Sequence, residues 1–154
     1  MRKSMFPLLL LITYTASFAA KENIYTKTAP QPIGIYSQAI KTGNTIYISG
    51  QIPIDPKTGN IIEGNFKDQV RQALKNVKEI AKAAGGNLDD IVKVSVYLTD
   101  LNNFSVVNEV MLESFNIPYP ARAVIEIKAL PKSATVEIEA VMRLNNADSN
   151  KISS

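Results

Sequence analysis

The sequence contains no histidine and no cysteine. These absences exclude histidine general bases, thiol nucleophiles, and metal sites built from histidine or cysteine. They also exclude disulfide bonds, so the stability of the fold must come from core packing or oligomerisation. Any chemistry therefore depends on Arg, Glu, Tyr, Asn and Ser side chains and on backbone groups.

The N-terminal residues have the composition of a secretory signal peptide. Arg2 and Lys3 precede an apolar run that continues to Phe18 and ends in small residues, which is the order of a signal peptide with its cleavage site. The run is short and interrupted by polar residues, whereas a membrane span needs about 20 apolar residues. We expect residues 1–19 to be removed after Ala19, with an uncleaved anchor as the alternative. The mature protein is then exported without stable membrane association: periplasmic if the source is Gram-negative, otherwise secreted.

The charge balance gives no support for a nucleic-acid partner. The full chain has 17 basic and 14 acidic residues, a net charge of +3, and two of the basic residues lie in the predicted signal peptide. Removal of that peptide leaves 15 basic against 14 acidic residues, so the mature protein is close to neutral. No cluster of Lys and Arg suggests a surface that follows a phosphate backbone.

The length of 154 residues suits a single folded domain. Residues 20–32 are polar and contain Pro30 and Pro32, which indicates an extended lead-in. We expect the folded domain to occupy residues 33–144. Residues 145–154 are rich in Asn, Ser and Asp and are predicted to be a disordered tail.

Hydrophobic periodicity predicts strands and two helices within this domain. A strand is expected over residues 45–49, and a buried one over 91–98. The first helix is expected over residues 66–84, with Asn65 as N-cap and Gly85-Gly86 at its end. The second begins at a cap on Asn102 or Asn103 and carries one apolar face, made of Phe104, Val107, Met111 and Phe115.

The C-terminal part of the domain is predicted to be a β-hairpin. One strand opens at Pro120-Ala121-Arg122, a turn lies at residues 130–133, and a second strand follows at residues 136–140. In that register Arg122 faces Val141, Glu126 faces Glu137, and all share one side of the sheet. Arg122 and Glu137 would still be roughly 13 Å apart, too far to hold one small ligand within a single chain.

This order of elements predicts an α+β fold. Each helix connects two strands, so the economical architecture is a mixed β-sheet with both helices on one face. The other face would carry apolar and functional residues without a helical cover. Such a face indicates burial against other subunits.

Taken alone, the candidate residues also have ordinary structural interpretations. Arg122 could be a solvated or ion-paired strand residue, and Glu137 part of an exposed alternation. Tyr36 beside a glycine turn could serve packing, and Asn108 could face solvent from a helix. The residue pattern by itself leaves both interpretations open.

Several short motifs in a fixed order make the chain resemble the RidA/YjgF family of enamine/imine deaminases, formerly named for translation inhibition and endoribonuclease activity. The resemblance covers residues 29–144 and implies a chorismate-mutase-like α+β fold, a homotrimer, and active sites in clefts between subunits. The motifs are Gly34-Ile35-Tyr36-Ser37-Gln38-Ala39, Ser49-Gly50-Gln51-Ile52-Pro53, Gln72-Ala73-Leu74-Lys75-Asn76, Val107-Asn108-Glu109, Pro120-Ala121-Arg122, Leu130-Pro131-Lys132 and Val136-Glu137-Ile138-Glu139-Ala140.

The resemblance also implies a reaction and a role for each site residue. The substrates would be 2-enamine and 2-imino acids, such as 2-aminoacrylate and 2-iminopropanoate, which are hydrolysed to 2-keto acids and ammonia without metal or cofactor. Arg122 and Glu137 would be catalytic: Arg122 would bind the substrate carboxylate, and Glu137 would position or activate water. Tyr36, Asn108 and the Gly50 backbone would complete the substrate-binding pocket.

Two features depart from the family pattern. Many relatives have Cys two residues after the arginine, where this chain has Val124, so thiol-based activity is excluded. The predicted signal peptide is the second departure.

The alternative function is a non-catalytic trimer that binds small ligands or acts as a chaperone. A third possible function, RNA-directed activity, is weakened by the near-neutral charge of the mature protein.

Overall fold

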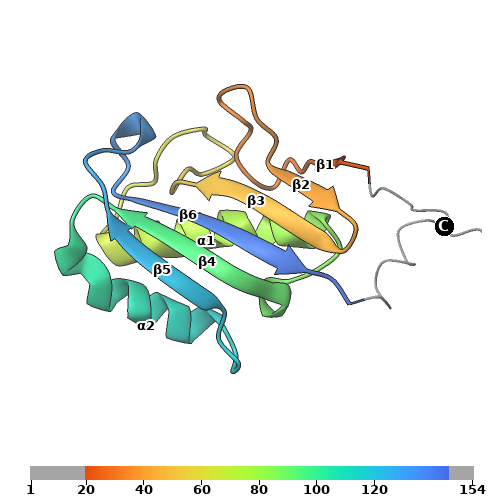
Figure 1. Ribbon diagram of the computed structural model, residues 1–154. Coiled ribbons are helices and arrows are strands. Elements are labelled where there is room, and N and C mark those ends of the chain that lie inside the picture. The colour runs from red at the N-terminus through yellow and green to blue at the C-terminus, as the bar shows by residue number, and fades with distance from the viewer. Residues whose placement is uncertain (1–19, 146–154) are drawn as a thin grey trace, which may run out of the picture.

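A six-stranded mixed sheet carries both helices on one face (Figure 1). The computed structural model describes residues 20–145, so the predicted signal peptide and all of the predicted tail except Asn145 lie outside the described residues. The strand order is β1-β2-β3-β6-β4-β5, which confirms the predicted α+β class. The elements are β1 (Glu22–Ile24), β2 (Ala39–Thr42), β3 (Thr45–Gln51), α1 (Phe66–Ala83), β4 (Ile91–Leu98), α2 (Phe104–Ser114), β5 (Ala121–Glu126) and β6 (Val136–Arg143). Within residues 20–145, neither helix has the length and apolar character needed to traverse a bilayer.

Helix α1 begins and ends as the sequence predicts. The Asn65 side chain accepts a hydrogen bond from the Asp68 backbone N–H at 3.0 Å, which satisfies a free donor of the first turn. At the other end Gly85 has a positive φ of 90°, and the Gly86 N–H donates to the Ala81 carbonyl at 3.0 Å. The cap and the glycine pair therefore set the length of α1.

Helix α2 begins at the predicted residue but is capped differently. Asn103 is its N-cap residue, yet its side chain makes no capping hydrogen bond. The Asp100 side chain instead accepts from the Asn102 N–H at 2.9 Å and so caps a short 3₁₀ turn over Leu101–Asn103 that leads into the helix.

The core lies between the sheet and the two helices. Strand β6 runs through the centre, and its alternate residues from Val136 to Met142 are buried on the helical side. Val94, Val96 and Leu98 of the neighbouring β4 are buried on the same side. The intervening residues of both strands lie on the opposite face, which no helix covers (Figure 1).

The sheet begins earlier than the predicted domain start at Ile33. Residues 22–24, inside the predicted lead-in, form β1 and pair with β2. The side chain of the buried Gln38 fastens the rest of the lead-in: its Nε2 donates to the carbonyls of Thr26 at 3.0 Å and Pro30 at 2.8 Å. Its Oε1 accepts from the Thr26 N–H at 2.7 Å.

The predicted hairpin between residues 121 and 140 is wrong. β5 and β6 do not pair with each other, because β4 lies between them, parallel to β5 and antiparallel to β6. The crossover through α2 lays β5 beside β4 as an edge strand. Strand β6 carries buried residues along its length and pairs on both sides, with β3 and β4.

The same topology corrects the predicted faces. Val94 of β4 is in register with Arg122 and with Ala140, so the Arg122 side chain lies on the helical face. Tyr97 is in register with Glu137, which lies on the uncovered face. Arg122 and Glu137 are therefore on opposite faces, with backbones about 14 Å apart by strand spacing and rise.

The pairings predicted for these strands are also absent from the sheet. Arg122 does not face Val141, and Glu126 does not face Glu137. The Glu126 carboxylate instead accepts from the Leu101 N–H at 2.7 Å, on the helical side.

Candidate active site

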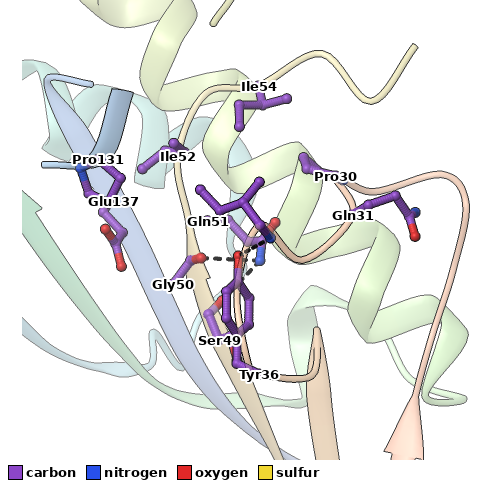
Figure 2. A pocket seen from close by; sticks show the side chains of 11 residues that line it. Pro30, Gln31, Tyr36, Ser49, Gly50, Gln51, Ile52, Ile54, Pro131 and Glu137 are labelled. Carbon is purple, nitrogen blue, oxygen red and sulfur yellow. Dashed lines mark hydrogen bonds between the residues drawn. The ribbon is translucent and has the colours of Figure 1, made fainter. Parts of the chain in front are cut away.

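One group of predicted site residues lines a cavity of about 270 Å³. Figure 2 shows this cavity, with Glu137 on β6 and Gly50 on the neighbouring β3. Tyr36, from the loop before β2, lies at the same cavity. We call the group of Tyr36, Gly50 and Glu137 the acidic half-site.

The Glu137 carboxylate packs directly against Gly50. A Cβ atom placed on Gly50 would overlap the carboxylate, at 2.7 Å from its carbon atom. Partial burial raises the pKa of Glu137, and the negative charge of Glu139 raises it further. No cation forms an ion pair with Glu137 within residues 20–145. Glycine at position 50 therefore makes room for a carboxyl group that can exchange a proton more readily than an ordinary glutamate.

Tyr36 is held at the rim of this cavity. Its hydroxyl oxygen accepts a hydrogen bond from the Ile33 N–H at 3.2 Å, and its own N–H donates to the Gly34 carbonyl at 3.1 Å. The residue is 47% exposed and lines the cavity, so it is accessible to a ligand there.

Much of the remaining wall of the cavity is apolar, and this part was not predicted. It includes Ile33, Ile52 and Ile54, and α1 holds part of it in place. The amide Nδ2 of the buried Asn76 donates to the carbonyls of Ile52 at 3.1 Å and Ile54 at 2.9 Å, and Gln72 donates to the second carbonyl at 3.1 Å. The sequence signal for this wall was the pair of amide side chains, Gln72 and Asn76, which lie four residues apart on the predicted helix.

The other predicted site residues line a second cavity, of about 490 Å³, beside α2 and the start of β5. Arg122 and Asn108 lie there with Met111 and Tyr119. We call Asn108 and Arg122 the basic half-site.

The Arg122 guanidinium has uncharged neighbours. Its Nη1 donates to the Met111 sulfur at 3.1 Å, and its central carbon lies 5.2 Å from the centroid of the Phe104 ring. Within the described part of the chain no carboxylate forms an ion pair with this guanidinium. Its charge is available to an anionic ligand.

The predicted site residues line cavities, but they are divided between two of them. Tyr36, Gly50 and Glu137 lie together, and Asn108 lies with Arg122. The two half-sites are separated within one chain because different elements position them. The pairing of β3 with β6 brings Gly50 and Glu137 together, whereas the edge strand β5 and helix α2 carry Arg122 and Asn108. Val124 lines neither cavity and packs against the core instead.

The uncovered face of the sheet has its own polar contact. The Tyr97 hydroxyl donates to the Glu139 carboxylate at 3.1 Å, and burial, followed by this hydrogen bond, raises the pKa of Tyr97. Searching residues 20–145 finds no group of three or more Asp, Glu, His or Cys side chains placed to hold a metal ion.

The sheet, the two helices and the order of the site residues define a known class of protein. The model of the family described as Endoribonuclease L-PSP matches residues 26–144 of the chain. The chain therefore belongs to this family, which is the RidA/YjgF family named by the resemblance.

Individual relatives agree with this assignment. A RutC family protein of Pyrococcus horikoshii is 56% identical over 79% of this chain and 96% of its own length. Human 2-iminobutanoate/2-iminopropanoate deaminase is 48% identical over 77% of this chain and 86% of its own. The crystal structure of RidA from an Antarctic Psychrobacter superposes with a TM-score of 0.78 at 50% identity, covering 80% of this chain and 99% of that one.

Proposed function

We propose that this protein is a 2-iminobutanoate/2-iminopropanoate deaminase, which hydrolyses reactive 2-enamine and 2-imino acids to 2-keto acids and ammonia. The observation that carries the proposal is the pair of half-sites. One offers an arginine that forms no ion pair with a carboxylate of residues 20–145, and the other offers a carboxyl group whose pKa is raised. The name of the human relative supports the same chemistry.

The proposed active site forms between two copies of the chain, as part of a homotrimer. The acidic half-site of one subunit meets the basic half-site of the next, a head-to-tail contact that closes into a ring. The uncovered face of the sheet supports this assembly, because it carries Tyr47 and Ile125, which are 53% and 48% exposed in the single chain.

In the proposed reaction, Arg122 binds the substrate carboxylate through two parallel N–H groups, assisted by Asn108. The planar arrangement fixes the direction of the substrate as well as its position. The imino carbon then lies near Glu137 of the neighbouring subunit. Because this carbon is already electrophilic, the protein has only to orient the water and manage the protons.

Glu137 moves the proton in both halves of the reaction. As water attacks the protonated imine, the C=N bond becomes a single bond, a C–O bond forms, and the Glu137 carboxylate takes one proton from the water. The resulting carbinolamine bears a hydroxyl and an amino group. Glu137 returns the proton to the amino group, the C–N bond breaks and ammonia leaves. The hydroxyl group then gives its proton to water, which leaves the carbonyl group of the 2-keto acid. An enamine enters the same path after protonation at its terminal carbon.

The decisive experiment generates imino acids in situ with an amino-acid oxidase and follows their decay with the mature protein. We expect the wild-type protein to accelerate the decay. Both Arg122→Ala and Glu137→Gln should lose at least about tenfold in kcat/KM, because charged hydrogen bonds contribute roughly 1.5 to 3 kcal/mol. Lys75→Ala is the control, since this exposed cation lies on α1 and lines neither half-site. Saturable binding without acceleration would instead identify a non-catalytic binding protein.

We also propose that the protein is exported and removes imino acids that amino-acid-oxidising enzymes release outside the cytoplasm. This proposal depends on the sequence of residues 1–19. Fractionation of the source cells, with mass spectrometry of the mature N-terminus, should find a chain that begins at Ala20 outside the cytoplasm. A mature protein confined to the cytoplasm would contradict it.

A further inference from the structure

Two arginines on or beside the helices, Arg71 and Arg122, are held in different ways. Arg71 is already neutralised: its Nε and Nη2 donate to the Glu113 carboxylate at 3.0 and 2.9 Å, and Asp68 lies 3.5 Å away. Arg122 instead contacts an aromatic ring and a thioether, Phe104 and Met111. One guanidinium is occupied by an acid, and the other is oriented without one.

The physical difference lies in which part of the guanidinium each partner uses. An aromatic ring attracts the flat face of the group and leaves the N–H donors at its edge free. A thioether is only a weak acceptor and carries no charge. Ring and sulfur together can therefore orient the Arg122 plane while most of its donors, and all of its charge, remain available to a carboxylate.

Both contacts come from the same helix that supplies Asn108. Phe104 is the first residue of α2, and Met111 follows two turns later, so the two lie along one side of the helix. Val107 and Val110, between them, are fully buried and anchor α2 to the core. The position of the Arg122 guanidinium is thus tied to a rigid element.

We propose that Phe104 and Met111 are positioning residues that hold the guanidinium of Arg122 and leave most of its N–H donors free for the substrate carboxylate. This inference rests on the proposed function, in which Arg122 binds that carboxylate. Neither side chain needs to touch the substrate. Their effect is to prepare one arginine orientation before the substrate arrives.

The kinetic test replaces the ring while retaining apolar bulk. Phe104→Leu should raise KM about two- to fivefold, the range for an exposed cation–π contact, and change kcat less than about twofold. Phe104→Tyr keeps the ring face and should retain the wild-type KM. Leu101→Ala is the matched control, because Leu101 is 43% exposed against 40% for Phe104 and precedes the same helix. Equal KM values for Phe104→Leu and Leu101→Ala would overturn the proposal.

A second measurement does not depend on activity. Nitrogen-15 relaxation of the Arg122 Nε–H group reports how rigidly the guanidinium is held. Its order parameter should fall in Phe104→Leu and in Met111→Leu, which removes the sulfur at nearly constant volume, and should stay unchanged in Leu101→Ala. An order parameter unchanged in both α2 variants would refute the positioning role. Absence of imine hydrolysis in the wild-type protein would refute the proposed function alone.

Discussion

The substitution Gly50→Ala separates catalysis from stability more cleanly than any other change at the acidic half-site. The new methyl group would lie 2.7 Å from the carboxyl carbon of Glu137 and 3.0 Å from its Cγ. Carbon atoms in contact prefer about 3.5 to 4.0 Å, and Oε1 would overlap the methyl group even more closely, so the carboxylate must move by at least about 1 Å. Gly50 is not among the glycines with a positive φ, and alanine therefore introduces no backbone strain there.

The expected magnitudes follow from this displacement. A misplacement of about 1 Å in a reacting group can cost about 100-fold in rate, so we expect kcat/KM to fall between about 10- and 100-fold. The cost in stability is small, because the end of a partly exposed side chain can rotate for about 0.5 to 1.5 kcal/mol. Replacement of glycine by alanine also stabilises by about 0.4 to 1 kcal/mol through the unfolded chain. The two contributions nearly cancel.

The assay measures imine hydrolysis and thermal unfolding on the same samples. Gly34→Ala is the matched control, because a Cβ there meets only the Tyr36 ring, at an ordinary 3.6 Å. The double variant Gly50→Ala with Glu137→Asp withdraws the carboxylate by one methylene group and should lose less than the product of the two single losses. Wild-type kcat/KM in Gly50→Ala, or a Tm drop of more than about 6 °C, would refute the steric explanation.

Three further outcomes follow from the geometry. Arg122→Lys keeps the charge but loses the paired donors, and should raise KM more than about fivefold in the imine assay. Glu139→Gln should move the acid limb of the pH profile of kcat/KM to lower pH. The reason is that Glu137 must be ionised to accept a proton, and removal of the Glu139 charge lowers the raised pKa of Glu137. Asn76→Ala removes two buried hydrogen bonds to the wall and should destabilise the fold by about 2 to 3 kcal/mol in urea unfolding, whereas the exposed Lys75→Ala should not.

Local patterns in the sequence predicted much of the fold. The apolar periodicity and the Asn65 cap define α1, and a β-branched run defines β4. Strands β1 and β2 were missed because they have three and four residues, too few to show a clear alternation. The contacts of Gln38 that fasten the preceding segment are tertiary, and no local signal predicts them.

The local sequence pattern could not predict that the site residues are divided between two cavities. Alternation along a strand shows which residues lie on the same side as Arg122, but it does not show whether that side faces the helices. That depends on the partner strand, and here the crossover through α2 places β4 between β5 and β6. The candidate residues themselves came from ordered motifs. The residue pattern alone left open whether Glu137 and Arg122 are ordinary strand residues or site residues, and the structure shows that each lines a cavity.

The central claim is that one subunit contributes Glu137 and another contributes Arg122 to each active site. The most direct test coexpresses Arg122→Ala and Glu137→Gln chains with different tags and isolates trimers that carry both. Each variant alone should be nearly inactive. In a randomly assembled ring made from equal amounts of the two chains, half of the acidic half-sites and half of the basic half-sites are intact. An intact acidic half-site therefore meets an intact basic half-site at about a quarter of the interfaces, and the unfractionated mixture should recover about a quarter of the wild-type activity. Mixed trimers as inactive as their parents would contradict the shared site.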